Sequence, residues 1–98
     1  MKPIYCFSNQ NGMFVCFNTF QEEDQFEEFL LFIKEKLLFV VNNTQQGPYS
    51  IIGKCEYNKN EFTVMFHEDT GCCIRVENEQ QVLFDEILEK LRAIGVQP

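Results

Sequence analysis

The sequence contains no tryptophan, a single histidine and only eight lysine and arginine residues among its 98 positions. Fifteen aspartates and glutamates give a net charge of −7, so the chain repels nucleic-acid phosphates and anionic lipid surfaces. No segment approaches the roughly 18 apolar residues of a membrane-spanning helix. The first residues, MKPIYCFSNQNG, also lack the hydrophobic stretch of a secretory signal. We therefore expect no direct binding to nucleic acid or membranes, and a basic protein as the natural partner.

The cysteines show no pattern of paired spacing. There are five, an odd number, and apart from the adjacent Cys72 and Cys73 they are scattered singly along the chain. Cysteines of this kind behave as small apolar residues in a reducing compartment. We expect free thiols, a cytoplasmic location and, from the chain length, a single domain over residues 1–98.

The first half of the chain predicts a hairpin followed by a helix. Two aromatic and β-branched runs, 3–8 and 13–18, flank an Asn11-Gly12 pair that suits a tight turn. Thr19 and Glu22 have the spacing of a capping box, which predicts a helix start. One apolar stripe then recurs at helical spacing: Phe26, Phe29, Leu30, Ile33, Leu37 and Val40.

The end of this helix has two interpretations. The sequence LLFVV at 37–41 either continues the helix or, being β-rich, has already left it as a strand. Residues 42–48, NNTQQGP, predict a loop.

The second half predicts three antiparallel strands and a last helix. The strands are 49–57, with Gly53 as a possible bulge, 62–68 and 72–76, joined by the turns NKNE and EDTG. Asn78 with Gln81 is expected to cap the last helix, and Gly95 to end it. Its expected buried residues are Leu83, Phe84, Ile87, Leu88, Leu91 and Ile94. The order ββ-α-βββ-α predicts an α+β fold, with about five mostly antiparallel strands and both helices on one face.

Residues 66–80 collect the reactive side chains of the chain. His67 lies near Glu68, Asp69 and the Cys72-Cys73 pair, so a cysteine nucleophile with His67 as its base is conceivable. However, adjacent residues of a strand point to opposite faces, and no glycine-rich oxyanion loop or second ligand pair is present. We expect a plain hairpin here, with no enzyme activity, no metal and no cofactor.

The outer side of the first helix combines apolar and acidic residues. At 100° per residue, Leu31, Phe32, Leu38 and Phe39 fall opposite the apolar stripe and are interleaved with Asp24, Glu28 and Glu35. If exposed, such a face supplies apolar anchors and carboxylates for a basic partner. The alternatives are a helix that is more buried or ends early, and a homodimer formed through this face.

In whole-chain pattern, the sequence resembles the small acidic cytoplasmic immunity proteins that neutralise contact-dependent or polymorphic bacterial toxins. The similarity lies in the acidic segment FQEEDQFEEFLLF and in the meander EFTVMFHEDTGCCIRVEN before an amphipathic helix. It implies a protein that blocks a cognate toxin, often a basic nuclease, by covering its active surface. The expected contact residues are Asp24, Glu27, Glu28, Leu31, Phe32 and Glu35, with Glu68 and Asp69 as a second patch. The alternatives are a phage-encoded inhibitor of a host nuclease or defence complex, and a homodimeric regulatory or ligand-binding domain.

Overall fold

The first two strands form a hairpin in the computed structural model, which describes residues 2–98. β1 (Ile4–Asn9) pairs antiparallel with β2 (Gly12–Phe17), so the first predicted hairpin is confirmed. Because Asn9 pairs with Gly12, the turn is made by Gln10 and Asn11. The predicted Asn11-Gly12 turn is therefore displaced by one residue.

The first helix starts with a different cap from the expected one. A short 3₁₀ turn, η1 (Glu23–Gln25), precedes α1 (Phe26–Glu35). Oε1 of Gln25 accepts hydrogen bonds from the backbone N–H groups of Gln21 at 2.9 Å and Glu22 at 3.0 Å. These amides have no partner within the helix, so Gln25 takes the capping role that was predicted for Glu22 with Thr19.

The segment after α1 is a strand rather than a longer helix. Leu38 has a φ of 60°, a left-handed conformation that a right-handed helix cannot continue. β3 (Val40–Gln46) follows and pairs with the next strand, which confirms the second of the two interpretations. The loop predicted over 42–48 is wrong for most of its length. β3 is an edge strand with mainly exposed side chains, so its polar residues remain in water.

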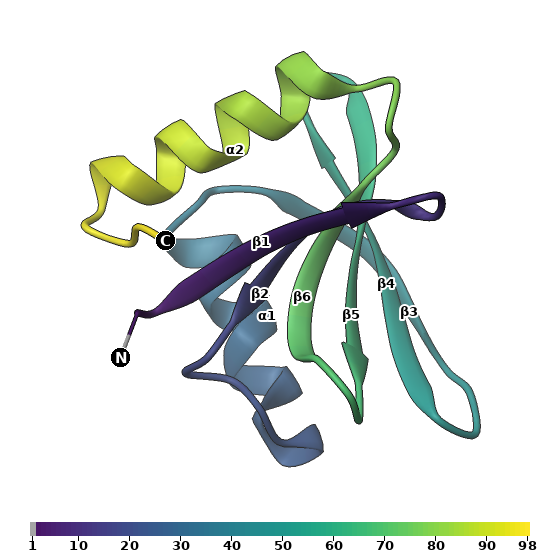
Figure 1. Ribbon diagram of the computed structural model, residues 1–98. Coiled ribbons are helices and arrows are strands. Elements are labelled where there is room, and N and C mark those ends of the chain that lie inside the picture. Colours follow the sequence, from purple (N-terminus) through teal and green to yellow (C-terminus); the bar gives the residue numbers. More distant parts are fainter. Residues whose placement is uncertain (1) are drawn as a thin grey trace.

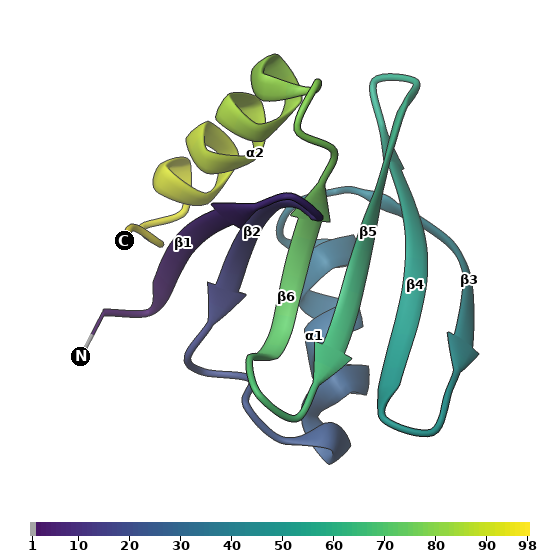
Figure 2. The same ribbon diagram turned by 45° about the vertical axis from the view of Figure 1, so that its right-hand side comes forward.

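The remaining strands complete one antiparallel sheet. β4 (Ser50–Tyr57), β5 (Asn60–His67) and β6 (Gly71–Val76) extend it to the order β1-β2-β6-β5-β4-β3 (Figures 1 and 2). The α+β class is confirmed, and the sheet has six strands because β3 joins the predicted set.

Gly53 does not form the expected bulge. It pairs regularly with Val64, while the irregularity lies in β3 between Val41 and Asn43. A Cβ on Gly53 would lie 3.1 Å from Cγ2 of Val64 and 3.2 Å from Cγ2 of Thr44. Crowding on this face of the sheet explains the glycine.

Both helices pack on one face of the sheet. α2 (Gln81–Ala93) and α1 contribute to a single core cluster with the strand side chains that face them. All of the predicted stripe of the first helix is buried except Val40, which lies in β3. α2 ends before Gly95, whose φ is 84°, as predicted. Ile94 is 42% exposed and lies beyond the helix, so its predicted burial is wrong.

Within residues 2–98, no helix combines the length and apolar character needed to cross a membrane.

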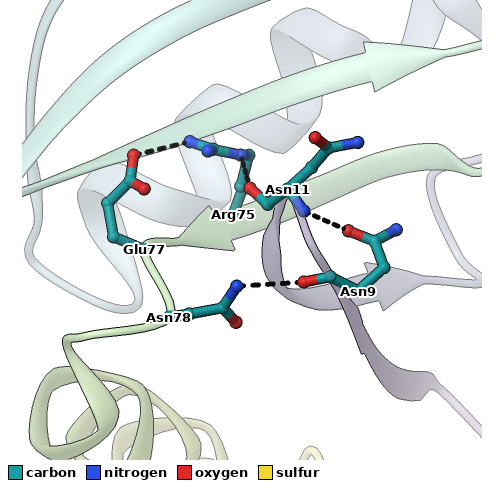
Figure 3. Close-up of polar contacts among 5 residues, drawn as sticks. All are labelled: Asn9, Asn11, Arg75, Glu77 and Asn78. Carbon is teal, nitrogen blue, oxygen red and sulfur yellow. Dashed lines mark hydrogen bonds and ion pairs between the residues drawn. The ribbon is translucent and has the colours of Figure 1, made fainter.

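The last helix lacks the predicted Asn78 cap, because Asn78 binds the first hairpin instead. Its Nδ2 donates to the backbone oxygen of Asn9 at 3.0 Å. Nearby, Nε of Arg75 donates to the backbone oxygen of Asn11 at 2.7 Å, and its Nη1 contacts Glu77 at 3.1 Å (Figure 3). Two side chains from the β6 region therefore hold the β1–β2 turn against the sheet.

We expect Arg75→Leu to lower the free energy of unfolding by about 1–2 kcal/mol, since a charged donor to a backbone carbonyl is lost. Urea unfolding measures the change. Glu77→Gln is the control, because it removes the Arg75 ion pair but leaves the bond to Asn11 in place. An equal loss in both variants would show that the ion pair, and not the bond to the hairpin, is the stabilising contact.

Candidate functional site

Seven of the fifteen acidic side chains lie at one end of the molecule. We call this surface the acidic end and define it by the exposed acidic residues of the β5–β6 turn, of η1 with the residue before it, and of the start of α1: Glu22, Glu23, Asp24, Glu27, Glu28, Glu68 and Asp69. In both ribbon views, the start of α1, the β5–β6 turn and the β3–β4 turn lie at this same end (Figures 1 and 2). The two acidic patches predicted separately are therefore neighbours.

Two adjoining hollows join these patches. The first, of about 340 Å³, is lined by Glu22 and the turn residues Glu68 and Asp69. The second, of about 270 Å³, is lined by Glu22, Glu23 and Glu68. Glu22, Glu68 and the mostly buried Phe66 line both. Carboxylates that are far apart in the sequence thus surround one continuous concave surface.

Aromatic side chains border the same hollows. Tyr49, in the β3–β4 turn, is 71% exposed and lines the second hollow, and Tyr5, 40% exposed, lines the first. Exposed tyrosines next to carboxylates supply large rigid contact area together with charge, a combination found at protein interfaces.

The turn between β5 and β6 is held in place by backbone contacts with the segment before η1. The backbone N–H of Cys72 donates to the carbonyl of Phe20 at 2.8 Å, which links β6 to the segment before η1. Gly71 lies so close to this segment that an added Cβ would be 2.9 Å from Cα of Gln21. The relative positions of Glu22 and Glu68 therefore depend on this backbone contact.

The apolar outer face predicted for the first helix does not form as expected. Leu31 and Leu38 are 52% and 71% exposed, but Phe39 is buried beneath Tyr57 and Phe62, with only 3% exposure. Phe32 is half-buried, with its ring centroid 5.7 Å from that of Phe17. The reason is that the helix ends at Glu35, and the following chain turns Phe39 back into the core.

Among the contact residues predicted for the first helix, Asp24, Glu27 and Glu28 belong to the acidic end and Glu35 does not. Glu35 is exposed at the other end of the helix, between Lys34 and Lys36. At about 1.5 Å per residue, the length of α1 separates it from the acidic carboxylates near Glu23. Leu31 lies between the two ends, on the exposed side of the helix.

The geometry around His67 does not assemble a nucleophile. The backbone N–H of Asp69 donates to Nδ1 of His67 at 3.1 Å, so that nitrogen acts as an acceptor within the turn. Cys72 faces the main core, where burial raises the pKa of its thiol to about 12. Cys73 belongs to a separate cluster on the other face of the sheet, which confirms that the two side chains point in opposite directions.

One pairing of cysteines was not predicted. Cys16 of β2 lies directly opposite Cys73 of β6, although 57 positions in the sequence separate residues 16 and 73. The strand order places β2 beside β6, and nothing in the spacing of the cysteines indicates that order.

Across residues 2–98, no three or more His, Cys, Asp or Glu side chains come together in a group that could hold a metal ion.

Comparison with known proteins gives no relative from which to transfer a function: no family model, no curated protein and no solved structure matches the chain.

Proposed function

We propose that the protein is a binding protein that inhibits a basic partner by covering the partner's active or substrate-binding surface with its acidic end. The observation that carries this proposal is the convergence of Glu22 and Glu23 with Glu68 and Asp69 around two shared hollows. Carboxylates on a single helix face commonly do no more than interact with water. Carboxylates from separate segments around a concave surface can instead receive a protruding basic group.

Binding follows from the charge and from the aromatic border. The net charge of −7 and the seven carboxylates of the acidic end raise the rate of encounter with a lysine- and arginine-rich surface. Tyr49 and Tyr5 then exclude water from the contact and slow dissociation. Carboxylates take the place of phosphate on a basic surface, so a nuclease is a suitable target.

The resemblance to immunity proteins supports a toxin domain as this partner, and the protein encoded beside its gene is the first candidate to test. We expect the double variant Glu22→Lys/Glu68→Lys to lower the association rate about ten-fold or more at low salt. Surface plasmon resonance at several salt concentrations measures this rate. Increasing salt is expected to reduce the difference, because it screens exposed charges.

The matched control is Glu61→Lys/Glu79→Lys. Both residues are exposed, both lie outside the acidic end, and the double variant changes the net charge by the same amount. The control is expected to bind nearly as fast as the original protein. If both double variants bind equally slowly, net charge acts without a defined site, and the acidic end is not the binding surface.

A second candidate function is that of a homodimeric regulatory domain. The observation that favours it is the sheet face that the helices leave uncovered. On this face Tyr5 is 40% exposed and Ile52 is 41% exposed, so both side chains are available to a second copy of the chain. Sedimentation velocity over a range of concentrations separates the two functions, because only a homodimer dissociates on dilution in the absence of any partner.

A further inference from the structure

Cys16 and Cys73 form a cross-strand pair on the uncovered face of the sheet. Their Cα atoms are partners in the β2–β6 register, and their exposures are 0% and 1%. Phe14 is buried in the same cluster, with Phe7 and Met65 packed against it. The two thiols therefore face each other in an apolar environment that belongs neither to the main core nor to the acidic end.

The hydrogen-bond pattern places this pair at the closer type of antiparallel position. The N–H of Cys72 points toward the β2 side of the sheet, because it donates to the carbonyl of Phe20. Successive backbone groups of a strand alternate in direction, so those of Cys73 point toward β5. Between β2 and β6, the pair of Cys16 and Cys73 is thus not hydrogen-bonded, and such pairs have Cα atoms about 4.5 Å apart. This separation lies within the range of about 4.4–6.8 Å that a disulfide requires.

Thr70 and Tyr5 are polar neighbours of the two cysteines. Oγ1 of Thr70 lies 3.9 Å from Sγ of Cys73, and Tyr5 is the β1 partner of Cys16. Tyr5 and Thr70 also line the first hollow of the acidic end, which is open to solvent. A small reagent in this hollow therefore contacts Tyr5 and Thr70, the neighbours of two thiols that are themselves buried.

The two thiols are not equivalent. Hydrogen bonding with the Cys73 thiol lowers the pKa of Cys16, with a further lowering from Tyr5, although burial acts in the opposite direction. The same interaction with Cys16, together with burial, raises the pKa of Cys73. The direction of these shifts favours Cys16 as the sulfur that is oxidised first, with Cys73 as the thiol that resolves an oxidised Cys16.

We propose that Cys16 and Cys73 form an oxidisable dithiol that reacts with a small hydroperoxide and closes reversibly to a disulfide within the folded sheet. The Cys16 thiolate attacks one oxygen of hydrogen peroxide, the O–O bond breaks, and the leaving hydroxide takes up a proton as water. The resulting sulfenic acid of Cys16 is attacked by the sulfur of Cys73. The S–O bond breaks, a second water leaves, and the S–S bond forms, so two thiols are oxidised while one peroxide is reduced.

The test uses the full chain with Cys6→Ser, because Cys6 is the one exposed cysteine among residues 2–98 and would otherwise link two molecules. The reduced protein is treated with one equivalent of hydrogen peroxide, alkylated and mapped by non-reducing peptide mass spectrometry. We expect one intramolecular crosslink joining the peptides of Cys16 and Cys73, and a mass lower by two hydrogen atoms. Closing this long loop should raise Tm by about 10 °C or more, and dithiothreitol should reverse the shift.

Two variants make the assignment specific. Cys72→Ala in the same background removes the adjacent thiol on the other face and is expected to leave the crosslink unchanged. Cys73→Ala is expected to abolish it and to leave a sulfenic acid on Cys16 that dimedone labels. A crosslink to Cys55 or Cys72, or oxidation of Cys16 without any crosslink in the Cys6→Ser protein, overturns the proposal. The peptide map of that protein decides the matter even if Cys73→Ala does not fold.

Discussion

Replacing Phe29 by alanine is expected to lower the free energy of unfolding by about 3–5 kcal/mol, the usual loss for a fully buried aromatic side chain. Phe29 is 0% exposed, and its ring centroid lies 5.1 Å from that of Phe17 and 5.6 Å from that of Phe20. Its removal leaves a cavity between α1 and β2 that neighbouring rings cannot fill without moving off their preferred rotamers. Thermal and urea unfolding measure the loss, which corresponds to a fall in Tm of at least about 12 °C.

Leu31→Ala is the matched control on the same helix. Leu31 is 52% exposed, so its truncation should change the free energy of unfolding by less than about 0.5 kcal/mol. Comparable losses of stability at the two positions would contradict the orientation of α1, in which Phe29 faces the sheet and Leu31 faces solvent. The pair also tests whether Leu31 is free to contact a partner, because a side chain that packs in the core is not available to a partner.

Gly71→Ala is expected to destabilise the protein by about 2–4 kcal/mol through backbone strain and a steric clash. Gly71 has a φ of 73°, and a Cβ there would lie 2.9 Å from Cα of Gln21 and 3.0 Å from the carbonyl oxygen of Phe20. Both neighbours are backbone atoms, so the segment before η1 has to move. Because that segment carries Glu22, we also expect slower association with the proposed basic partner. Denaturant unfolding and the binding assay measure the two effects.

Gly95→Ala separates the strain from the clash. Gly95 also has a positive φ, 84°, but no atom lies within 4 Å of an added Cβ. Only the left-handed conformation is penalised there, at about 1 kcal/mol, and binding is expected to be unchanged. If Gly95→Ala destabilises the protein as much as Gly71→Ala does, the close approach of the β5–β6 turn to Gln21 is not what makes Gly71 necessary.

Local periodicity predicted most of the fold. The stripe from Phe26 to Leu37 was identified correctly, and the turn predicted at 68–71 differs only in that Gly71 already belongs to β6. Both features depend on residues only a few positions apart. Prediction failed where the local structure depends on a contact that the neighbouring sequence does not reveal. β3 exists because β4 pairs with it, although its polar residues have the composition of a loop. Asn78 was assigned to a helix cap because its bond to Asn9 cannot be foreseen from the neighbouring sequence.

The candidate site was predictable only in part. The acidic residues of α1 and of the β5–β6 turn were identified as two patches, but their approach depends on the contact of Gly71 with Gln21. Glu22 was assigned to a helix cap and Tyr49 to the first position of a strand, and neither assignment indicates a binding surface. Phe39 was placed on the wrong side of the chain, since the prediction for it assumed a helix that continued beyond Glu35.

The position of β6 between β2 and β5 has a consequence for the order of folding. The pairs β3–β4, β4–β5 and β5–β6 join neighbouring segments and close short loops, whereas β2 meets β6 only after the intervening chain has been brought back. Loop closure over such a distance is entropically unfavourable and is expected to come late. The register of Cys16 with Cys73 and the contact between Gln21 and Gly71 both await this last step. A partly folded chain thus has its carboxylates but not their arrangement, so binding of the proposed basic partner is expected only after folding is complete.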